Sequence, residues 1–265
     1  MSEESWWEKY YRRGIWARKT LAPPKPILDI KEMLEKLSEV TDEQWGRYAF
    51  RKELLRRKFT EEQRQAYTIR ANECGVEYAQ KMIREFNTRD PKKLAEKLGA
   101  TVSFPSRPER SIKGNQVLFA QFAEPDKISV FTDCTERAND AAEEFGLSRY
   151  FAEKSIRNIL VAHEVFHMVE FKYQDSIFTR TEKINLLPFK IISNWSTIRC
   201  LGEMAGMRFA KEVLELPFSP YLLDVFLLHL YHRQKASDLY RAIMKIIFPE
   251  QNDKSEETNR EFYES

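Results

Sequence analysis

The sequence has few cysteines and no long apolar run, and each shortage argues against a class of protein. The three cysteines, Cys74, Cys134 and Cys200, are odd in number, widely spaced and without a Cys-x-x-Cys pair. This argues against a disulfide framework and against a thiolate zinc site. No stretch approaches about 18 uncharged apolar residues, and the acidic N-terminus lacks the apolar run of a signal peptide. We therefore expect a cytoplasmic protein with no membrane partner.

The charge balance points to no polyanionic partner. The sequence has 43 basic and 41 acidic side chains among 265 residues, which gives a formal net charge of +2. Basic and aromatic residues do alternate between Trp45 and Phe59. Such a pattern can bind nucleic acid, but it is more often a solvated helix face whose aromatic side chains pack inward. Nucleic-acid binding is therefore the less favoured interpretation.

Two of the four histidines lie in His163-Glu164-Val165-Phe166-His167, inside an apolar segment typical of a helix. On a helix, His163 and His167 stand at i and i+4 on one face, where two imidazoles can bind one Zn²⁺. Glu164 would then lie beside the open coordination position as the catalytic base. The alternative is a pair of core histidines without a metal.

The pattern of apolar residues and helix-capping signals predicts an α+β fold, mostly helical, with a small antiparallel sheet beside the motif helix. We expect four regions: an N-terminal helical extension over 1–65 with a Pro-rich linker near 22–26, a core over 66–217, a C-terminal helical region over 218–248, and a disordered acidic tail over 249–265. Residues 1 to about 26 and the tail should be dispensable for folding.

Within the core, capping signals and apolar runs predict individual elements. They are a short helix over 90–99, a strand over 101–104, a hairpin of 117–122 with 127–131, the motif helix from Ser148 to about Tyr173, an irregular segment over 174–188, and a helix from about Phe189 that ends before Pro217. An exposed sheet edge, for which 127–131 is the candidate, could hold an extended substrate by strand addition.

A zinc site of this type needs a third protein ligand from another element. Glu203 is the best candidate, because Gly202, Ala205 and Gly206 leave one helix face almost bare, and such faces allow two helices to approach closely. The alternative is a surface glutamate beside a close helix crossing. Three other glutamates are weaker candidates: Glu170, Glu182 and Glu212.

The helix over 90–99, the strand, the hairpin, the His-Glu-x-x-His motif and the segment from Glu203 to Pro217 together resemble the ImmA/IrrE group of gluzincin-type metallopeptidases. The resemblance covers roughly residues 66–217 and implies a minimal zincin-like core. It also implies a cytoplasmic zinc peptidase that cleaves a protein regulator, commonly a helix-turn-helix repressor. In that family's pattern, His163, His167 and Glu203 are metal ligands and Glu164 is the catalytic base.

Three features depart from the family pattern. Phe166 replaces a small glycine, and Met207 stands where gluzincins often place an Asp or Asn that orients a ligand histidine. The segment between His167 and Glu203 is also long for the family. Loss of an orienting carboxylate typically weakens metal affinity by about 10- to 100-fold.

A peptidase also needs a donor for the oxyanion of the tetrahedral intermediate. The sequence offers five candidates without deciding between them: Tyr173, Arg199, His229, Tyr231 and His232. A different class of function remains open as well. The protein could be a regulator with a structural or vestigial metal site, which binds its partner through the helical N-terminal region without cutting it.

Overall fold

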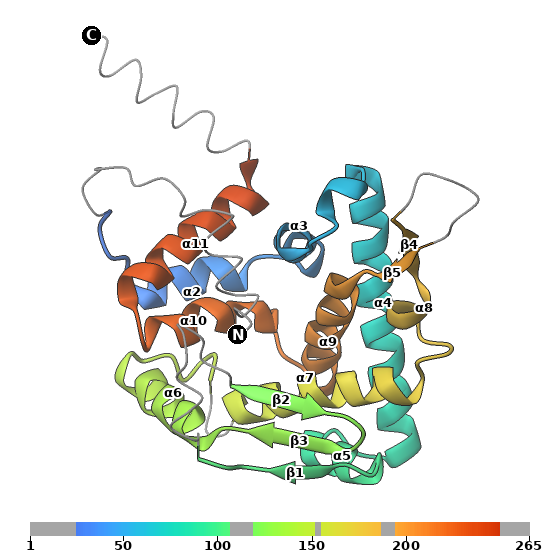
Figure 1. Ribbon diagram of the computed structural model, residues 1–265. Helices are drawn as coiled ribbons and strands as arrows, with labels where there is room; N and C mark the ends of the chain where they lie inside the picture. Colours follow the sequence, from blue (N-terminus) through green and yellow to red (C-terminus); the bar gives the residue numbers. More distant parts are fainter. Residues whose placement is uncertain (1–24, 107–118, 152–154, 187–193, 250–265) are drawn as a thin grey trace, which may run out of the picture.

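The computed structural model describes residues 25–106, 119–151, 155–186 and 194–249. The fold is α+β and mostly helical, as the sequence predicts (Figure 1). The acidic tail and nearly all of the N-terminal segment predicted to be dispensable lie outside the described residues. Among the described residues, no helix is both long and apolar enough to cross a lipid bilayer.

Two short helices open the described chain, and both begin at side-chain caps. In α2 (Ile30–Ser38), the carboxylate of Asp29 accepts hydrogen bonds from two backbone N–H groups of the first turn. In α3 (Asp42–Lys52), Thr41 and Gln44 form a reciprocal capping box. The aromatic side chains expected to interleave with basic ones are Trp45, Tyr48, Phe50 and Phe59, and all four are buried in the core. They are therefore unavailable for stacking on bases.

The longest helix, α4 (Glu61–Phe86), follows the one-turn 3₁₀ helix η1 (Arg56–Lys58). It starts at a second capping box, formed by Thr60 and Gln63, and ends at Asn87, whose φ of 49° is the left-handed conformation common at helix ends. Its neighbour is α9 (Arg199–Leu214). A Cβ atom on Gly75 would lie only 2.4 Å from the carbonyl oxygen of Ala205, so glycine is what permits this crossing.

The sheet has three short strands in the order β1-β3-β2. The strands are β1 (Thr101–Ser103), β2 (Ala120–Ala123) and β3 (Lys127–Val130), and the helix before them is α5 (Pro91–Lys97). The hairpin β2–β3 is antiparallel as predicted, but β1 pairs with β3 in parallel, so the sheet is mixed. The prediction that residues 127–131 form an edge was wrong, because β3 lies between the other two strands.

The motif helix, α7, spans Ser155–Lys172 and does not begin at Ser148. A separate helix, α6 (Thr132–Glu144), precedes it and was not predicted. Gly146, interpreted from the sequence as a helix breaker, adopts a φ of 64° just after α6. Its left-handed conformation therefore ends α6, and does not introduce α7.

The segment after α7 is more structured than expected. The one-turn helix α8 (Phe178–Thr181) is followed by β4 (Lys183–Asn185), which pairs antiparallel with β5 (Trp195–Thr197). The helix predicted from about Phe189 was placed too early, because Trp195 belongs to β5 and α9 starts only at Arg199. The β-branched Thr197 and Ile198 and the aromatic Trp195 favour extended backbone there.

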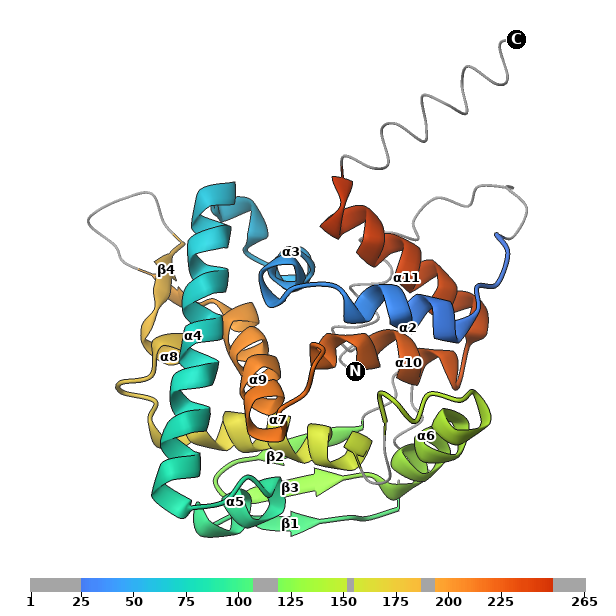
Figure 2. The ribbon, with the colours of Figure 1, turned by 180° about the vertical axis from the view of Figure 1, so that it is seen from behind.

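The C-terminal region is helical as predicted. It comprises the one-turn 3₁₀ helix η3 (Pro220–Leu222), α10 (Leu223–His229) and α11 (Arg233–Ile247). These helices pack with α2 and α3 around one apolar cluster, while α4, α5, the sheet, α7 and α9 enclose a second. Figures 1 and 2 show α7 running between the sheet on one side and α9 on the other.

The close approach at Gly75 predicts whether a substitution there stabilises or destabilises the protein. Gly75→Ala should destabilise the protein by about 1–3 kcal/mol, because the added methyl group collides with the backbone of α9. Helix propensity alone predicts the opposite, a gain of about 1 kcal/mol. Denaturant unfolding measures the difference, and Ala66→Gly at an exposed position of α4 calibrates the propensity effect. A Gly75→Ala variant as stable as wild type would mean that the two helices can separate freely.

Candidate metal centre

The crossing of α7 and α9 is close because small residues of α9 face the motif helix. A Cβ atom on Gly206 would stand 3.0 Å from the ring of His163. A Cβ atom on Gly202 would stand 2.8 Å from the carboxylate of Glu170. The bare face noted in the sequence therefore lies against the histidine-bearing face of α7, and it leaves room for Glu203 to reach the same point.

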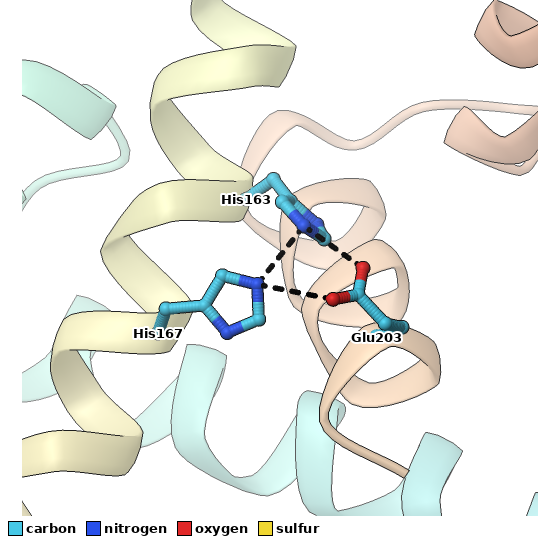
Figure 3. Close-up of side chains that lie close together, drawn as sticks. All are labelled: His163, His167 and Glu203. Atoms are coloured by element: carbon cyan, nitrogen blue, oxygen red, sulfur yellow. Dashed lines mark hydrogen bonds and ion pairs between the residues drawn. The ribbon is translucent and has the colours of Figure 1, made fainter. Parts of the chain in front are cut away.

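The structure brings His163, His167 and Glu203 together, with their polar atoms directed at one another (Figure 3). The two Nε2 atoms are 3.1 Å apart. The carboxylate of Glu203 lies 3.4 Å from Nε2 of His163 and 3.8 Å from Nε2 of His167. These are the three ligands proposed from the sequence, and they come from two helices.

The spacing of these donors fits a tetrahedral cation. Two ligand atoms at about 2.05 Å from Zn²⁺ and at the tetrahedral angle are about 3.3 Å apart. The two Nε2 atoms are 3.1 Å apart, and each faces its own oxygen of Glu203: Oε2 lies 3.4 Å from His163 and Oε1 lies 3.8 Å from His167. Two imidazole nitrogens and one carboxylate oxygen also form a ligand set that zinc prefers. The residues present therefore fit the ion.

The group is sheltered on one side and open on the other. The side chains of His163 and His167 are 14% and 20% exposed, whereas that of Glu203 is 55% exposed. A structural zinc site is normally closed by four protein ligands, while a catalytic site keeps one position open. The described residues supply three converging donors, one of them on a solvent-exposed side chain.

The charges of the metal-free group stabilise one another. Neighbouring protein atoms oppose ionisation of Glu203, but the hydrogen bond with His163 and the charge of His167 outweigh them and lower the pKa of Glu203 to about 2. Burial likewise opposes the charge of His167, yet the hydrogen bond to Glu170 and the charges of Glu203 and Glu164 raise the pKa of His167 to about 9. In the metal-free protein, His167 is therefore protonated at neutral pH.

Glu164 is buried next to this group and faces the sheet. Its Oε2 atom accepts a hydrogen bond of 2.6 Å from the backbone N–H of Phe122 in β2. Its negative charge contributes to the raised pKa of His167, so it acts electrostatically on the centre. The contact with Phe122 also gives this carboxylate a structural role in an apolar helix, which the sequence did not reveal.

The three weaker candidates for the third ligand have other partners. Glu182 accepts a hydrogen bond from the hydroxyl of Tyr67. Glu212 pairs with Arg208. Glu170 contacts Nδ1 of His167, on the side of the ring opposite to the nitrogen that faces Glu203. The i,i+3 spacing of His167 and Glu170 on one helix was the sequence signal for that contact.

The proposed oxyanion donors have contacts elsewhere. Tyr173 packs against Tyr78 and lies under the ammonium group of Lys81. The ring of His229 meets Phe145, and Tyr231 packs near Phe119. None of the five candidates belongs to the His–His–Glu group that the described residues form.

Two of the three departures from the family pattern, Phe166 and Met207, have different consequences. Phe166 is buried and packs against Phe209, so its ring occupies the core and does not fill the open side. Met207 is a partly buried apolar residue, and Nδ1 of His163 is buried with no hydrogen-bond partner among the described residues. Within the described ranges, the first histidine therefore has no orienting acceptor.

The N-terminal helices help to hold the centre. The buried carboxylate of Glu53, at the end of α3, accepts hydrogen bonds of 3.0 Å from the N–H groups of Leu55 and Cys200. Cys200 lies in the first turn of α9, one turn before Glu203. The region predicted as an extension thus caps the helix that carries the third ligand.

Fold and site together define an α+β protein with a His–His–Glu group suited to one metal ion. No family model matches the chain, and comparisons with curated proteins and with solved structures return no similar protein. The resemblance to the ImmA/IrrE group consequently depends on the sequence motifs alone.

The raised pKa of His167 predicts a pH dependence. In the metal-free protein the protonated ring should add stability that is fully present below its unfolded pKa of about 6.5 and is lost as pH rises toward 9. Zinc must displace that proton, so its apparent affinity should rise by up to about tenfold per pH unit over the same interval.

Thermal unfolding of chelator-treated protein and zinc titration, each between pH 6.5 and 9, measure the two slopes. Removing the imidazole in His167→Gln should flatten the stability slope. Equal slopes in wild type and this variant would show that the proton resides on another group.

Proposed function

We propose that the protein is a zinc-dependent endopeptidase. The observation that carries this proposal is the convergence of His163, His167 and Glu203 at tetrahedral-ligand spacing, with one side open to solvent. The buried carboxylate of Glu164, which is next in sequence to a ligand, adds the acid–base group that hydrolysis requires.

Each residue has a defined chemical role in this proposal. A bound Zn²⁺ would supply Lewis-acid chemistry, polarising the scissile carbonyl and making a water molecule acidic enough to serve as nucleophile at neutral pH. Glu164 accepts the proton of that water through the carboxylate oxygen that Phe122 does not engage, and later delivers it to the leaving amine. The Phe122 N–H meanwhile holds the other oxygen in place.

Strand β2 is the edge at which an extended substrate would bind. It pairs on one side with β3, and the register places Ala120 and Phe122 at alternate positions of the hairpin. Because the N–H of Phe122 points to Glu164 and not to β3, the outward backbone groups of β2 lie on the same side as the catalytic base. Strand addition here would bring a peptide bond toward the centre.

The resemblance to the ImmA/IrrE group supports a finer version of the proposal. The substrate would be a protein regulator such as a helix-turn-helix repressor, and cleavage would take place in the cytoplasm. Cys74 and Cys200 are buried as free thiols, which agrees with a reducing compartment.

Two observations favour a second function. Glu164 accepts a hydrogen bond from the backbone of Phe122, so this carboxylate has a structural role that does not require catalysis. The same motif would therefore also suit a regulator that binds its partner without cutting it. Nδ1 of His163, which has no hydrogen-bond partner within the described part of the chain, also agrees with a vestigial site. Metal binding and proton transfer must therefore be tested separately.

The first test is the zinc content of the purified protein. Wild type should hold about one zinc ion per chain, and His163→Ala should hold less than about a tenth of that, because three-ligand sites depend on each ligand. Exposed His232, immediately before α11, provides a control: His232→Ala should retain the wild-type content. Equal zinc in wild type and His163→Ala would place any bound metal elsewhere.

The second test separates catalysis from binding. Glu164→Gln keeps a carbonyl oxygen for the Phe122 N–H but removes the base, so cleavage should fall by about 10²-fold or more while zinc content and stability persist. New protein N-termini, quantified in cells that express wild type or the variant, provide a readout even though the substrate is unidentified. If the two proteomes show the same N-termini, the proposal of a peptidase is wrong and that of a non-cleaving regulator takes its place.

A further inference from the structure

We infer that Glu170 is the positioning residue that orients the second ligand histidine, His167. The inference rests on the proposed metal centre and adds to it a residue outside the ligand set. Glu170 lies at the end of the motif helix and is 3% exposed, although an unpartnered buried carboxylate is costly. Its contacts explain why it is tolerated there.

One carboxylate oxygen of Glu170 contacts the ligand histidine directly. Oε2 lies 2.9 Å from Nδ1 of His167. A carboxylate acceptor at Nδ1 fixes the proton on that nitrogen and leaves the Nε2 lone pair for a metal. Nε2 of His167 is the atom that faces His163 and Glu203. The contact thus selects the tautomer and the ring orientation that ligation needs.

The other contacts hold this carboxylate in place. The hydroxyl of Thr179 donates to Oε1 at 2.5 Å, and the guanidinium of Arg180 lies 3.5 Å from Oε2. Both residues belong to α8, in the segment between His167 and Glu203 that is long for the family. That segment therefore supplies the groups that fix Glu170 against His167.

Helix α9 packs against the same carboxylate. A Cβ atom on Gly202 would stand 2.8 Å from Oε1 and 3.1 Å from Oε2 of Glu170. Glycine at this position thus leaves space for the carboxylate one residue before the third ligand. The same helix that presents Glu203 to the centre also determines where Glu170 can lie.

Two alternatives are weaker. Glu170 as a metal ligand would need to reach the Nε2 side of His167, but its carboxylate occupies the Nδ1 side. A purely structural carboxylate would need only Thr179 and Arg180 as partners, and the short contact with the imidazole would then be incidental. The second alternative predicts that metal affinity is independent of Glu170.

The test measures zinc dissociation constants by chelator competition at one pH. Glu170→Ala should weaken zinc binding by about 10- to 100-fold, the usual effect of removing such an acceptor. Glu170→Gln retains an oxygen acceptor for Nδ1–H and should recover much of this loss. The matched control is Glu182→Gln, which alters a carboxylate of the same segment that contacts Tyr67, and should change zinc affinity less than about twofold.

Gly202→Ala provides an independent variant in case Glu170→Ala does not fold. The added methyl group displaces the carboxylate and leaves all three ligands in the sequence, so zinc affinity should fall in the same direction although alanine favours the helix. Co²⁺-loaded protein should show a changed visible absorption spectrum in Gly202→Ala and Glu170→Ala. The spectrum of Glu182→Gln should match wild type.

The outcomes separate this inference from the proposed function. If wild type binds no zinc, the metal centre itself is wrong. If wild type binds zinc and both Glu170→Ala and Gly202→Ala bind it equally well with unchanged cobalt spectra, the metal centre stands and the positioning role is overturned. Weaker binding in both variants, with recovery in Glu170→Gln, supports the role.

Discussion

The close crossing of α7 and α9 is the constraint on which the centre depends. Helices normally pack with their axes about 8–10 Å apart, and the distance is set by the side chains at the contact. Here Gly202 and Gly206 remove those side chains where the imidazoles and the carboxylate of Glu170 must fit. Gly75 of α4 allows the same close approach on another side of α9. A larger residue at Gly206 would press on His163 and one at Gly202 would press on Glu170, whereas one at Gly75 would press on the backbone of α9.

The second constraint is electrostatic. Glu164 and Glu170 are buried, and Glu203 adjoins two histidines, so three carboxylates converge on one small volume. Each has a specific partner: a backbone N–H for Glu164, a hydroxyl and an imidazole for Glu170, and two imidazoles for Glu203. Without a metal the cluster retains a proton on His167, so proton binding and metal binding compete for one place.

The regions outside the motif helices contribute to this frame. Glu53 caps α9 from the N-terminal region, and Lys211 of α9 forms an ion pair with Asp42 of α3. The aromatic residues Trp45, Tyr48 and Tyr221 pack together, which joins α3 to the C-terminal helices. The N-terminal and C-terminal helices consequently fix the position of α9, the helix that carries Glu203.

The sequence by itself determined the local features: the capped helices, the β2–β3 hairpin, and the placement of His163 and His167 on one helix face. Their signals are short-range, since helix caps, turn residues and i,i+4 spacing act within a few residues. The role of Glu203 could also be predicted, because a carboxylate beside a helix face of glycine and alanine is recognisable in the sequence.

Only the tertiary structure decided the rest. The parallel pairing of β1 with β3 and the bonds from Phe122 to Glu164 and from Cys200 to Glu53 join residues that are 26 to 147 positions apart. The role of Glu170 depends on where α8 and α9 come to lie. Long-range contacts of this kind are selected by how whole elements pack, and no local pattern encodes them.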